Sequence, residues 1–161
     1  MAIKKGDRLP DVLLKRMSDD GPAEFSISKV SEGRKIVIVG LTGAFTTTCH
    51  NTHIPGYLEN LETLKGKGVD EIIIVSVNDH NVMGAWGEAL NADGKLTFAA
   101  DFDAEFTKQI GMDIDLAIAG LGLRSKRYAM IVDDGIVTDV SIDEGRGVVD
   151  ESGAAAVMEK L

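Results

Sequence analysis

The sequence predicts an α/β fold, a central mixed sheet flanked by helices. Two segments rich in isoleucine and valine, residues 35–41 and 71–77, are typical of buried strands. Apolar residues recur at helical spacing between them, and a β-α-β unit of this kind favours a parallel strand pair. Later in the chain, Asp133-Asp134-Gly135 separates two more strand-like segments and predicts a tight antiparallel hairpin. A sheet that holds both kinds of pair is mixed.

The other elements follow in order along the chain. The first predicted helix has an apolar face and ends near two glycines; that face is formed by Ile54, Tyr57, Leu58, Leu61 and Leu64. Pro55 predicts a kink in this helix, because proline lacks an N–H and its ring clashes with the preceding turn. A second helix is predicted over 79–90, with an expected buried face of Val82, Ala85, Trp86 and Ala89. The remaining predicted elements are a strand at 96–100, a helix at 104–110, the hairpin strands 128–132 and 136–142, and a closing helix at 152–161.

Length, charge and cysteine content limit the classes of protein. The 161 residues predict one domain, residues 1–161, that is large enough to bury a core. A net charge of −9 argues against nucleic acid and anionic membranes as partners, since both reward a basic surface. No segment has the pattern of a signal peptide or of a membrane span, so we expect a cytoplasmic protein.

Cys49 is the only cysteine, and its surroundings point to a reactive thiol. It follows the strand 35–41 through a loop of glycines and threonines and lies near the start of the first helix. A helix N-terminus favours the thiolate, which is the nucleophilic form of cysteine. The alternative is a buried cysteine that packs as a small hydrophobe. The polar neighbours Thr46–Thr48 and His50 weigh against that alternative, and the threonine hydroxyls are candidates to cap the helix or to reach the sulfur.

These segments resemble the peroxiredoxins, which reduce hydroperoxides at a cysteine thiolate. The family loop pattern Pro-x-x-x-Thr-x-x-Cys falls on Thr42, Thr46 and Cys49, with threonine in place of the proline. The closer resemblance is to the type II subfamily, which includes the plant type II enzymes and mammalian peroxiredoxin five. It rests on the segments 43–46, 52–57, 76–79, 82–86 and 122–130, and covers the chain from about residue 6 to residue 161. The resemblance implies a thioredoxin-like fold and a peroxidase that needs no cofactor.

The resemblance also assigns catalytic roles. Cys49 is the implied nucleophile, and Thr46 the hydroxyl that orients the peroxide beside the sulfur. Spacing alone does not choose among the arginines, which are Arg8, Arg16, Arg34, Arg124, Arg127 and Arg146. The resemblance selects Arg127, directly before Tyr128-Ala129-Met130, to stabilise the thiolate and hold the peroxide oxygens through its planar fork of donors.

Thr42, Gly43 and Thr48 complete the implied active-site loop, and Thr48 is expected to cap the helix and supply a backbone N–H. The family proline at position 42 packs over the thiolate and stiffens the loop, so threonine there is expected to reduce activity or alter substrate access. His80-Asn81 is a second departure, since the subfamily usually has a proline and an aromatic residue there.

The single cysteine predicts a one-cysteine catalytic cycle. Attack on hydrogen peroxide or an organic hydroperoxide makes a sulfenic acid, which normally condenses with a resolving thiol, and this chain has none. An external thiol, glutathione with glutaredoxin or thioredoxin, is therefore the expected partner. A homodimer is also expected, because Phe45 lies in an exposed loop and Trp86 in a helix that borders the usual subfamily interface. The alternative for both aromatic side chains is a place in the core.

Other functions compete with this interpretation. Cys49 and His53, four residues apart on a helix, form a candidate metal-ligand pair with His50 nearby, but no second cluster of metal ligands accompanies them. His53 is more simply a packed, hydrogen-bonded helix residue, and no metal is expected. A thiol phosphatase is disfavoured because position 55 is proline rather than the arginine of a Cys-x-x-x-x-x-Arg loop. A non-catalytic scaffold and a peroxide sensor that acts by mixed disulfide with a partner protein remain as alternatives.

Overall fold

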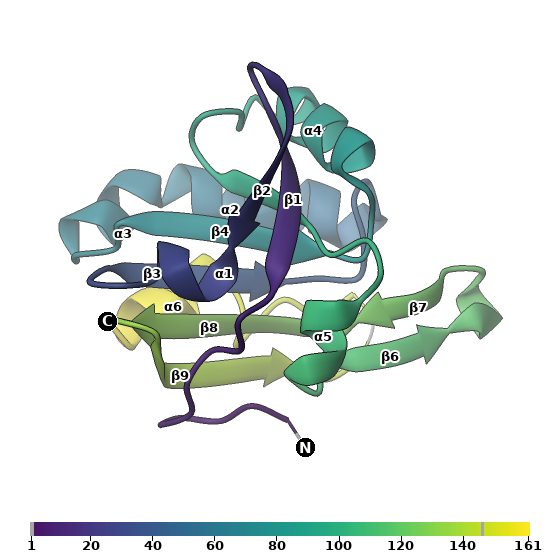
Figure 1. The fold of residues 1–161 in the computed structure, drawn as a ribbon. Helices are drawn as coiled ribbons and strands as arrows, with labels where there is room; N and C mark the ends of the chain where they lie inside the picture. Colours follow the sequence, from purple (N-terminus) through teal and green to yellow (C-terminus); the bar gives the residue numbers. More distant parts are fainter. Residues whose placement is uncertain (1, 146) are drawn as a thin grey trace.

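The computed structural model describes residues 2–145 and 147–161. Within these residues the main sheet has seven strands in the order β2-β1-β5-β4-β3-β8-β9 (Figure 1). Its strands are β1 (Leu13–Ser18), β2 (Gly21–Ser26), β3 (Lys35–Gly40), β4 (Glu71–Ser76), β5 (Thr97–Ala100), β8 (Arg127–Asp133) and β9 (Ile136–Asp143). A separate hairpin of β6 (Asp113–Leu116) and β7 (Gly122–Ser125) projects beyond one end of the sheet (Figure 1).

The central strands confirm the predicted mixed sheet. β3 and β4 pair in parallel, as do β4 and β5, whereas β8 runs antiparallel to both β3 and β9. The β8–β9 turn has positive φ at Asp134 and Gly135, which is the backbone that a two-residue hairpin of this twist requires. The strand, hairpin and helix order expected from the sequence is therefore present in the central and C-terminal parts of the sheet.

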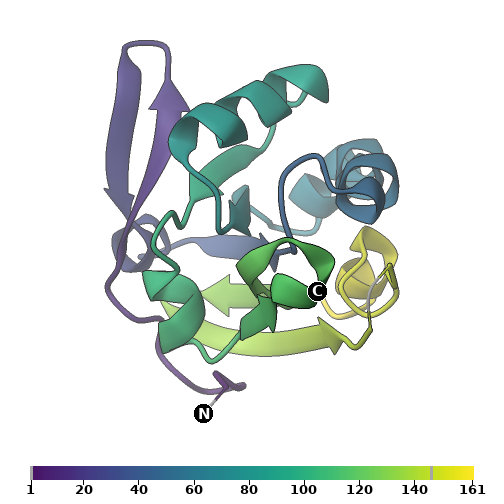
Figure 2. The ribbon, with the colours of Figure 1, turned by 90° about the vertical axis from the view of Figure 1, so that its right-hand side faces the viewer.

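Helices cover both faces of the sheet. They are α1 (Ile27–Val30), α2 (Ile54–Glu59), α3 (Leu61–Gly66), α4 (His80–Ala89), α5 (Glu105–Gln109) and α6 (Ala154–Glu159), together with short π and 3-10 turns at Cys49–His53 and Ala117–Ala119. Figure 2 shows α2, α3 and α6 on one side of the sheet and α5 on the other. Within the described residues, no helix is long and apolar enough to cross a membrane.

Alternation along the central strands builds a core on each face. Val37 and Val39 of β3 pack in a first core cluster with α2, α3, α4 and α6. Ile36 and Ile38 of the same strand pack in a second core cluster with α1 and α5. Successive side chains of a strand point to opposite faces. In β3 and β8, therefore, the odd-numbered residues face the first core cluster and the even-numbered residues face the second.

The predicted buried face of α4 is wrong in part. Ala85 and Ala89 are exposed, and the helix instead buries Met83, Trp86 and Gly87. The reason lies in tertiary packing, since Gly87 lets the helix approach the ring of Phe98 closely. The β1–β2 and β6–β7 hairpins were also not predicted, because their strands alternate poorly and expose much of their length.

The helix that follows β3 begins irregularly. Residues Cys49–His53 form a π-helical turn in which the N–H of Ile54 donates to the carbonyl of Cys49. Pro55 lies in the first turn of α2, where it has no N–H to donate. The kink expected at Pro55 stays a prediction, and the irregularity that the structure shows is the wider turn directly before it. π-Turns of this kind occur often at functional sites.

Gly40, at the end of β3, is required by the aromatic ring opposite it. An added Cβ would lie 2.0 Å from Cε1 of Tyr128, its cross-strand partner. We predict that Gly40→Ala lowers the free energy of unfolding by about 3 kcal/mol, because the buried ring has to move. Chemical denaturation measures this loss. Gly56→Ala is the matched control, since nothing lies within 4 Å of its Cβ position and alanine favours a helix; equal stabilities for the two variants would contradict the packing account.

Candidate active site

β8 delivers a buried guanidinium to Cys49. Arg127 has the same parity as Ala129 and Ile131, which pack in the first core cluster, so its side chain points to the face that carries the π-turn. Its Nη1 lies 3.2 Å from the Sγ of Cys49, although the two residues are 78 positions apart. Cys49 is fully buried and Arg127 almost so. The structure therefore brings these two predicted site residues into contact.

His53 is the second partner of the guanidinium. Nη1 of Arg127 also lies 2.8 Å from Nδ1 of His53, and Nε2 of the same ring lies 3.0 Å from the carbonyl of Ser152. An arginine only donates hydrogen bonds and a carbonyl only accepts them, so the ring is neutral with its proton on Nε2. Burial, with help from the positive charge of Arg127, lowers the pKa of His53 to about 4, and the carbonyl of Ser152 opposes this shift only in part.

The positive charge of Arg127 stays available to the sulfur. Among the described residues, no carboxylate forms an ion pair with this guanidinium, and its hydrogen-bond partners are the thiol and a neutral imidazole. A charge away from water acts more strongly on its neighbours than one at the surface. The arrangement is suited to stabilise negative charge that develops during a reaction at the sulfur or on an oxygen beside it.

The loop between β3 and the π-turn is fixed by hydrogen bonds from three directions. The Thr46 hydroxyl donates to the carbonyl of Gly43 at 2.6 Å, which leaves the Thr46 oxygen free to accept a hydrogen bond from a substrate. The side-chain oxygen of Asn78 accepts from the N–H of Ala44 at 3.0 Å. From β7, Nη1 of Arg124 donates to the carbonyl of Thr42 at 3.4 Å.

The structure brings most of the predicted site residues together. Cys49 and Arg127 are in contact, and Thr42, Gly43 and Thr46 form the loop beside them. The predicted cap at Thr48 is wrong: its side chain makes no capping hydrogen bond, because its backbone is already helical. Among the other arginines, Arg34 pairs with Glu71 at 2.9 Å, whereas Arg146 lies outside the described residues.

Three residues at the site were not assigned their roles from the sequence. His53 was expected to be a packed, hydrogen-bonded residue, and it is also the acceptor that orients Arg127. Asn78 and Arg124 both hold the active-site loop, and both lie in segments that carried the family resemblance. The signal for His53 was its spacing of four from Cys49, which on a helix places both side chains near one another. That spacing suggested a metal site, but the cation that both side chains meet is the guanidinium of Arg127.

An aromatic group borders the loop. Phe45 is 49% exposed and has a positive φ of 62°. Its ring stacks on His50 at 5.7 Å between centroids, and Nδ1 of His50 accepts a 3.0 Å hydrogen bond from the indole of Trp86. Trp86 itself is buried, so of the two aromatic residues expected at an interface only Phe45 presents surface, and Trp86 is a core residue.

Comparison with known proteins identifies relatives along the whole chain. Residues 4–158 match the protein family described as Redoxin. Peroxiredoxin-2C of Oryza sativa is 41% identical over 160 residues, which cover 99% of this chain and 98% of that protein. The crystal structure of reduced Prx3 from Vibrio vulnificus in complex with hydrogen peroxide superposes with a TM-score of 0.93. Its sequence is 40% identical, and 98% of each chain is covered. Peroxiredoxin 5 from Alvinella pompejana is 34% identical, with a TM-score of 0.85 and coverage of 98% of this chain and 96% of that one. These structures confirm the predicted thioredoxin-like fold.

The neutral state of His53 predicts how stability depends on pH. Its pKa is lowered from 6.5 to about 4 in the folded protein, so the unfolded chain binds the extra proton first as the pH falls. The stabilisation is complete above pH 6.5 and is lost as the pH falls to about 4, a loss of about 3 kcal/mol in the free energy of unfolding. Denaturant titrations across this window should show the loss in the intact protein and not in His53→Gln.

The half-buried His80 at the start of α4 offers a matched control for this prediction. His80→Gln should retain the pH dependence of the intact protein. Asp143 does not confuse the measurement, because its pKa starts from 3.8 and is lowered further in the fold. Identical pH profiles for the intact protein and His53→Gln would contradict the neutral, buried state of His53.

Proposed function

The chain belongs to the redoxin family and is a peroxiredoxin of the type II subfamily, a thiol-dependent peroxidase, and from this premise we propose that Cys49 is its peroxide-reducing nucleophile. The observation that carries the proposal is the 3.2 Å contact between the Sγ of Cys49 and Nη1 of Arg127. Both groups are buried, and no carboxylate among the described residues competes for the guanidinium.

The first half-reaction follows from these positions. The Cys49 thiolate attacks the terminal oxygen of the hydroperoxide R–O–O–H, an S–O bond forms, and the O–O bond breaks. Cysteine becomes a sulfenic acid, and the leaving alkoxide takes a proton to become R–OH. Arg127 stabilises the negative charge as it moves from sulfur to the leaving oxygen. The Thr46 oxygen accepts a hydrogen bond from the peroxide O–H and holds the substrate in line, because its own hydrogen is already donated to Gly43.

The second half-reaction needs a thiol from outside the chain. One thiol attacks the Cys49 sulfenic acid, and water leaves as a mixed disulfide forms. A second thiol then releases the Cys49 thiol and leaves as part of an external disulfide. Cys49 is the only cysteine of the sequence, so the thiol that reduces it has to come from another molecule. We assign this reduction to glutathione with glutaredoxin, or to thioredoxin. We place the cycle in the cytoplasm, where thiol pools are kept reduced, and cell fractionation tests this placement.

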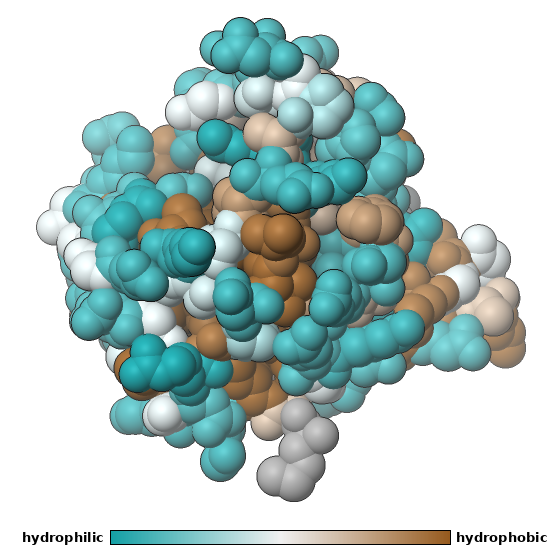
Figure 3. Space-filling view, viewed as in Figure 1, coloured by the Kyte–Doolittle hydropathy of each residue, from teal (hydrophilic) through white to brown (hydrophobic). Residues whose placement is uncertain are grey.

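The assembly we propose is a homodimer formed through the end of the molecule that carries the active-site loop. Phe45 is 49% exposed there, and Ile118 (99%) and Leu123 (38%) lie on the β6–β7 hairpin. Figure 3 shows apolar surface along this projecting hairpin. Arg124 connects the hairpin to the active-site loop, so both apolar regions belong to one end of the protein. Sedimentation velocity that shows only a monomer at micromolar concentration would contradict the proposal.

Removal of the guanidinium tests the catalytic assignment. We expect Arg127→Ala to slow the oxidation of Cys49 by hydrogen peroxide about 100- to 1,000-fold, because one donor to the developing charge is lost. Stopped-flow fluorescence of Trp86 follows the reaction. Arg16→Ala, on an exposed arginine of β1, is the matched control and should react like the intact protein. A slow rate in the intact protein, similar to that of free cysteine and unchanged in Arg127→Ala, would refute the peroxidase site and favour a non-catalytic scaffold.

The products of oxidation test the one-cysteine cycle. Peroxide without thiol should add oxygen atoms to the monomer mass, whereas peroxide with glutathione should give a transient mixed disulfide on Cys49 and steady peroxide consumption. Intact-protein mass spectrometry and a coupled peroxide assay measure these outcomes. Fast oxidation that no small thiol, glutaredoxin or thioredoxin can reverse would contradict the cycle and would identify a peroxide sensor instead.

A further inference from the structure

The carboxylate of Asp143 is the anion closest in register to the catalytic guanidinium, yet it does not pair with it. Asp143 ends β9 directly opposite Arg127 of β8. Directly opposite residues of an antiparallel pair project from the same face, about 5 Å apart at Cβ. Among the described residues, however, Asp143 forms no ion pair. Its position therefore requires a different explanation.

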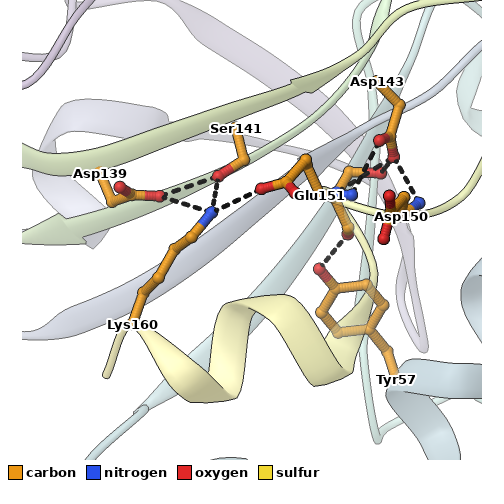
Figure 4. Close-up of polar contacts among 8 residues, drawn as sticks. Tyr57, Asp139, Ser141, Asp143, Asp150, Glu151 and Lys160 are labelled. Atoms are coloured by element: carbon orange, nitrogen blue, oxygen red, sulfur yellow. Dashed lines mark hydrogen bonds and ion pairs between the residues drawn. The ribbon is translucent and has the colours of Figure 1, made fainter.

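The loop before α6 occupies both oxygens of this carboxylate. Asp143 accepts the backbone N–H groups of Asp150 at 3.0 Å, Glu151 at 2.8 Å and Ser152 at 3.1 Å, and also a short hydrogen bond from the Ser152 hydroxyl (Figure 4). Burial disfavours the ionised carboxylate, but the hydrogen bonds from Ser152, Asp150 and Glu151 outweigh burial and lower the pKa of Asp143. The ionised side chain thus fixes the backbone of residues 150–152.

This loop carries the contact onward to the active site. The carbonyl of Ser152, a fully buried residue, accepts from the hydroxyl of Tyr57 at 2.6 Å (Figure 4) and from Nε2 of His53 at 3.0 Å. The hydroxyl oxygen of Ser152 also lies 3.2 Å from the same Nε2. Because that hydroxyl donates its hydrogen to Asp143, it faces the imidazole as an acceptor. Both groups of Ser152 therefore favour the proton on Nε2 of His53.

We propose that Asp143 and Ser152 are positioning residues of the peroxidase site, which hold His53 as the Nε2–H tautomer so that its Nδ1 accepts from Arg127. The donors then run in one direction, from Arg127 to His53, from His53 to Ser152 and from Ser152 to Asp143. Every member of this chain is buried. A ring with its proton on Nδ1 would present a donor to the guanidinium and push it away from Cys49.

The same hydrogen bonds keep a competing anion away from the guanidinium. A carboxylate that turned toward Arg127 would neutralise the charge on which the thiolate depends. Asp143 accepts four hydrogen bonds from residues 150–152, so it is held in place on the side of the loop. The contacts of Asp143 and Ser152 thus have two effects on Arg127. They fix the tautomer of His53, and they hold the Asp143 carboxylate away from the guanidinium.

This inference rests on the proposed peroxidase function and is tested with Ser152→Ala and Asp143→Asn. We expect each variant to slow the oxidation of Cys49 by hydrogen peroxide about 10- to 100-fold, the cost typical of removing an outer partner that orients a functional histidine. Ser141→Ala is the matched control. It also removes a largely buried hydroxyl from the network that joins β9 to α6 (Figure 4), through Lys160, but it lies outside the chain that leads to His53.

Two further measurements separate positioning from a general loss of structure. Nitrogen-15 NMR of the imidazole should place the His53 proton on Nε2 in the intact protein and in Ser141→Ala, and should reveal a second tautomer in Ser152→Ala. Ser152→Ala added to His53→Gln should change the peroxide rate less than twofold, because the histidine is gone and the backbone N–H groups of residues 150–152 still hold Asp143. Should Asp143→Asn fail to fold, Ser152→Ala still decides.

The outcomes distinguish the two proposals. A fast intact protein whose rate is unchanged in Ser152→Ala, or a His53 proton found on Nδ1, overturns the positioning role and leaves the peroxidase intact. A slow intact protein overturns the peroxidase, and the NMR result still supports or refutes the arrangement of His53.

Discussion

The candidate active site depends on one buried cation shared between a sulfur and a neutral imidazole. Nη1 of Arg127 lies 3.2 Å from the Sγ of Cys49 and 2.8 Å from Nδ1 of His53. A buried charge without a partner is costly, so the guanidinium needs both acceptors. The imidazole satisfies it without neutralising it, which leaves its charge to act on the sulfur. Three features contribute to this one contact: the face of β8 from which Arg127 projects, the π-turn that carries Cys49 and His53, and the loop before α6.

The threonine at position 42 is the clearest departure from the family pattern, and the loop around it shows how the site is held without the proline. The carbonyl of Thr42 accepts from Arg124, and Gly43 lies so close to the same guanidinium that a Cβ would be 2.5 Å from its Nη1. Asn78 fixes the loop again at Ala44. Hydrogen bonds from β7 and from the end of β4 thus supply some of the rigidity that the ring of a proline provides.

The sequence predicted those features that depend on local pattern. The strands 35–41 and 71–77 and the hairpin at Asp133-Asp134-Gly135 have a period or a turn that is visible within a few residues, and all three are present. The buried face of α4 was predicted incorrectly, because it depends on how closely Gly87 approaches Phe98. The β1–β2 hairpin was missed because its strands are largely exposed and give no clear alternation.

The candidate site divides in the same way. Cys49 was singled out by its local surroundings and Thr46 by the family loop pattern around it, whereas Arg127 lies 78 residues beyond Cys49 and was selected through the family resemblance alone. Nothing local to Asp143 or Ser152 indicates that Ser152 contacts His53 while Asp143 holds Ser152, since these contacts exist only once β9, the loop before α6 and the π-turn have packed together. Roles that depend on such tertiary contacts cannot be predicted from sequence motifs or from hydrophobic periodicity.

The most direct test of the account compares two reactions of Cys49 in the intact protein, oxidation by hydrogen peroxide and alkylation by iodoacetamide. A thiolate alone accelerates both reactions, whereas a guanidinium that stabilises the leaving oxygen accelerates only the first. We predict a peroxide-to-alkylation rate ratio about 100- to 1,000-fold above that of free cysteine, which is the loss expected when one such donor is removed. A ratio equal to that of free cysteine would mean that Arg127 does not act on the peroxide, and would contradict the account.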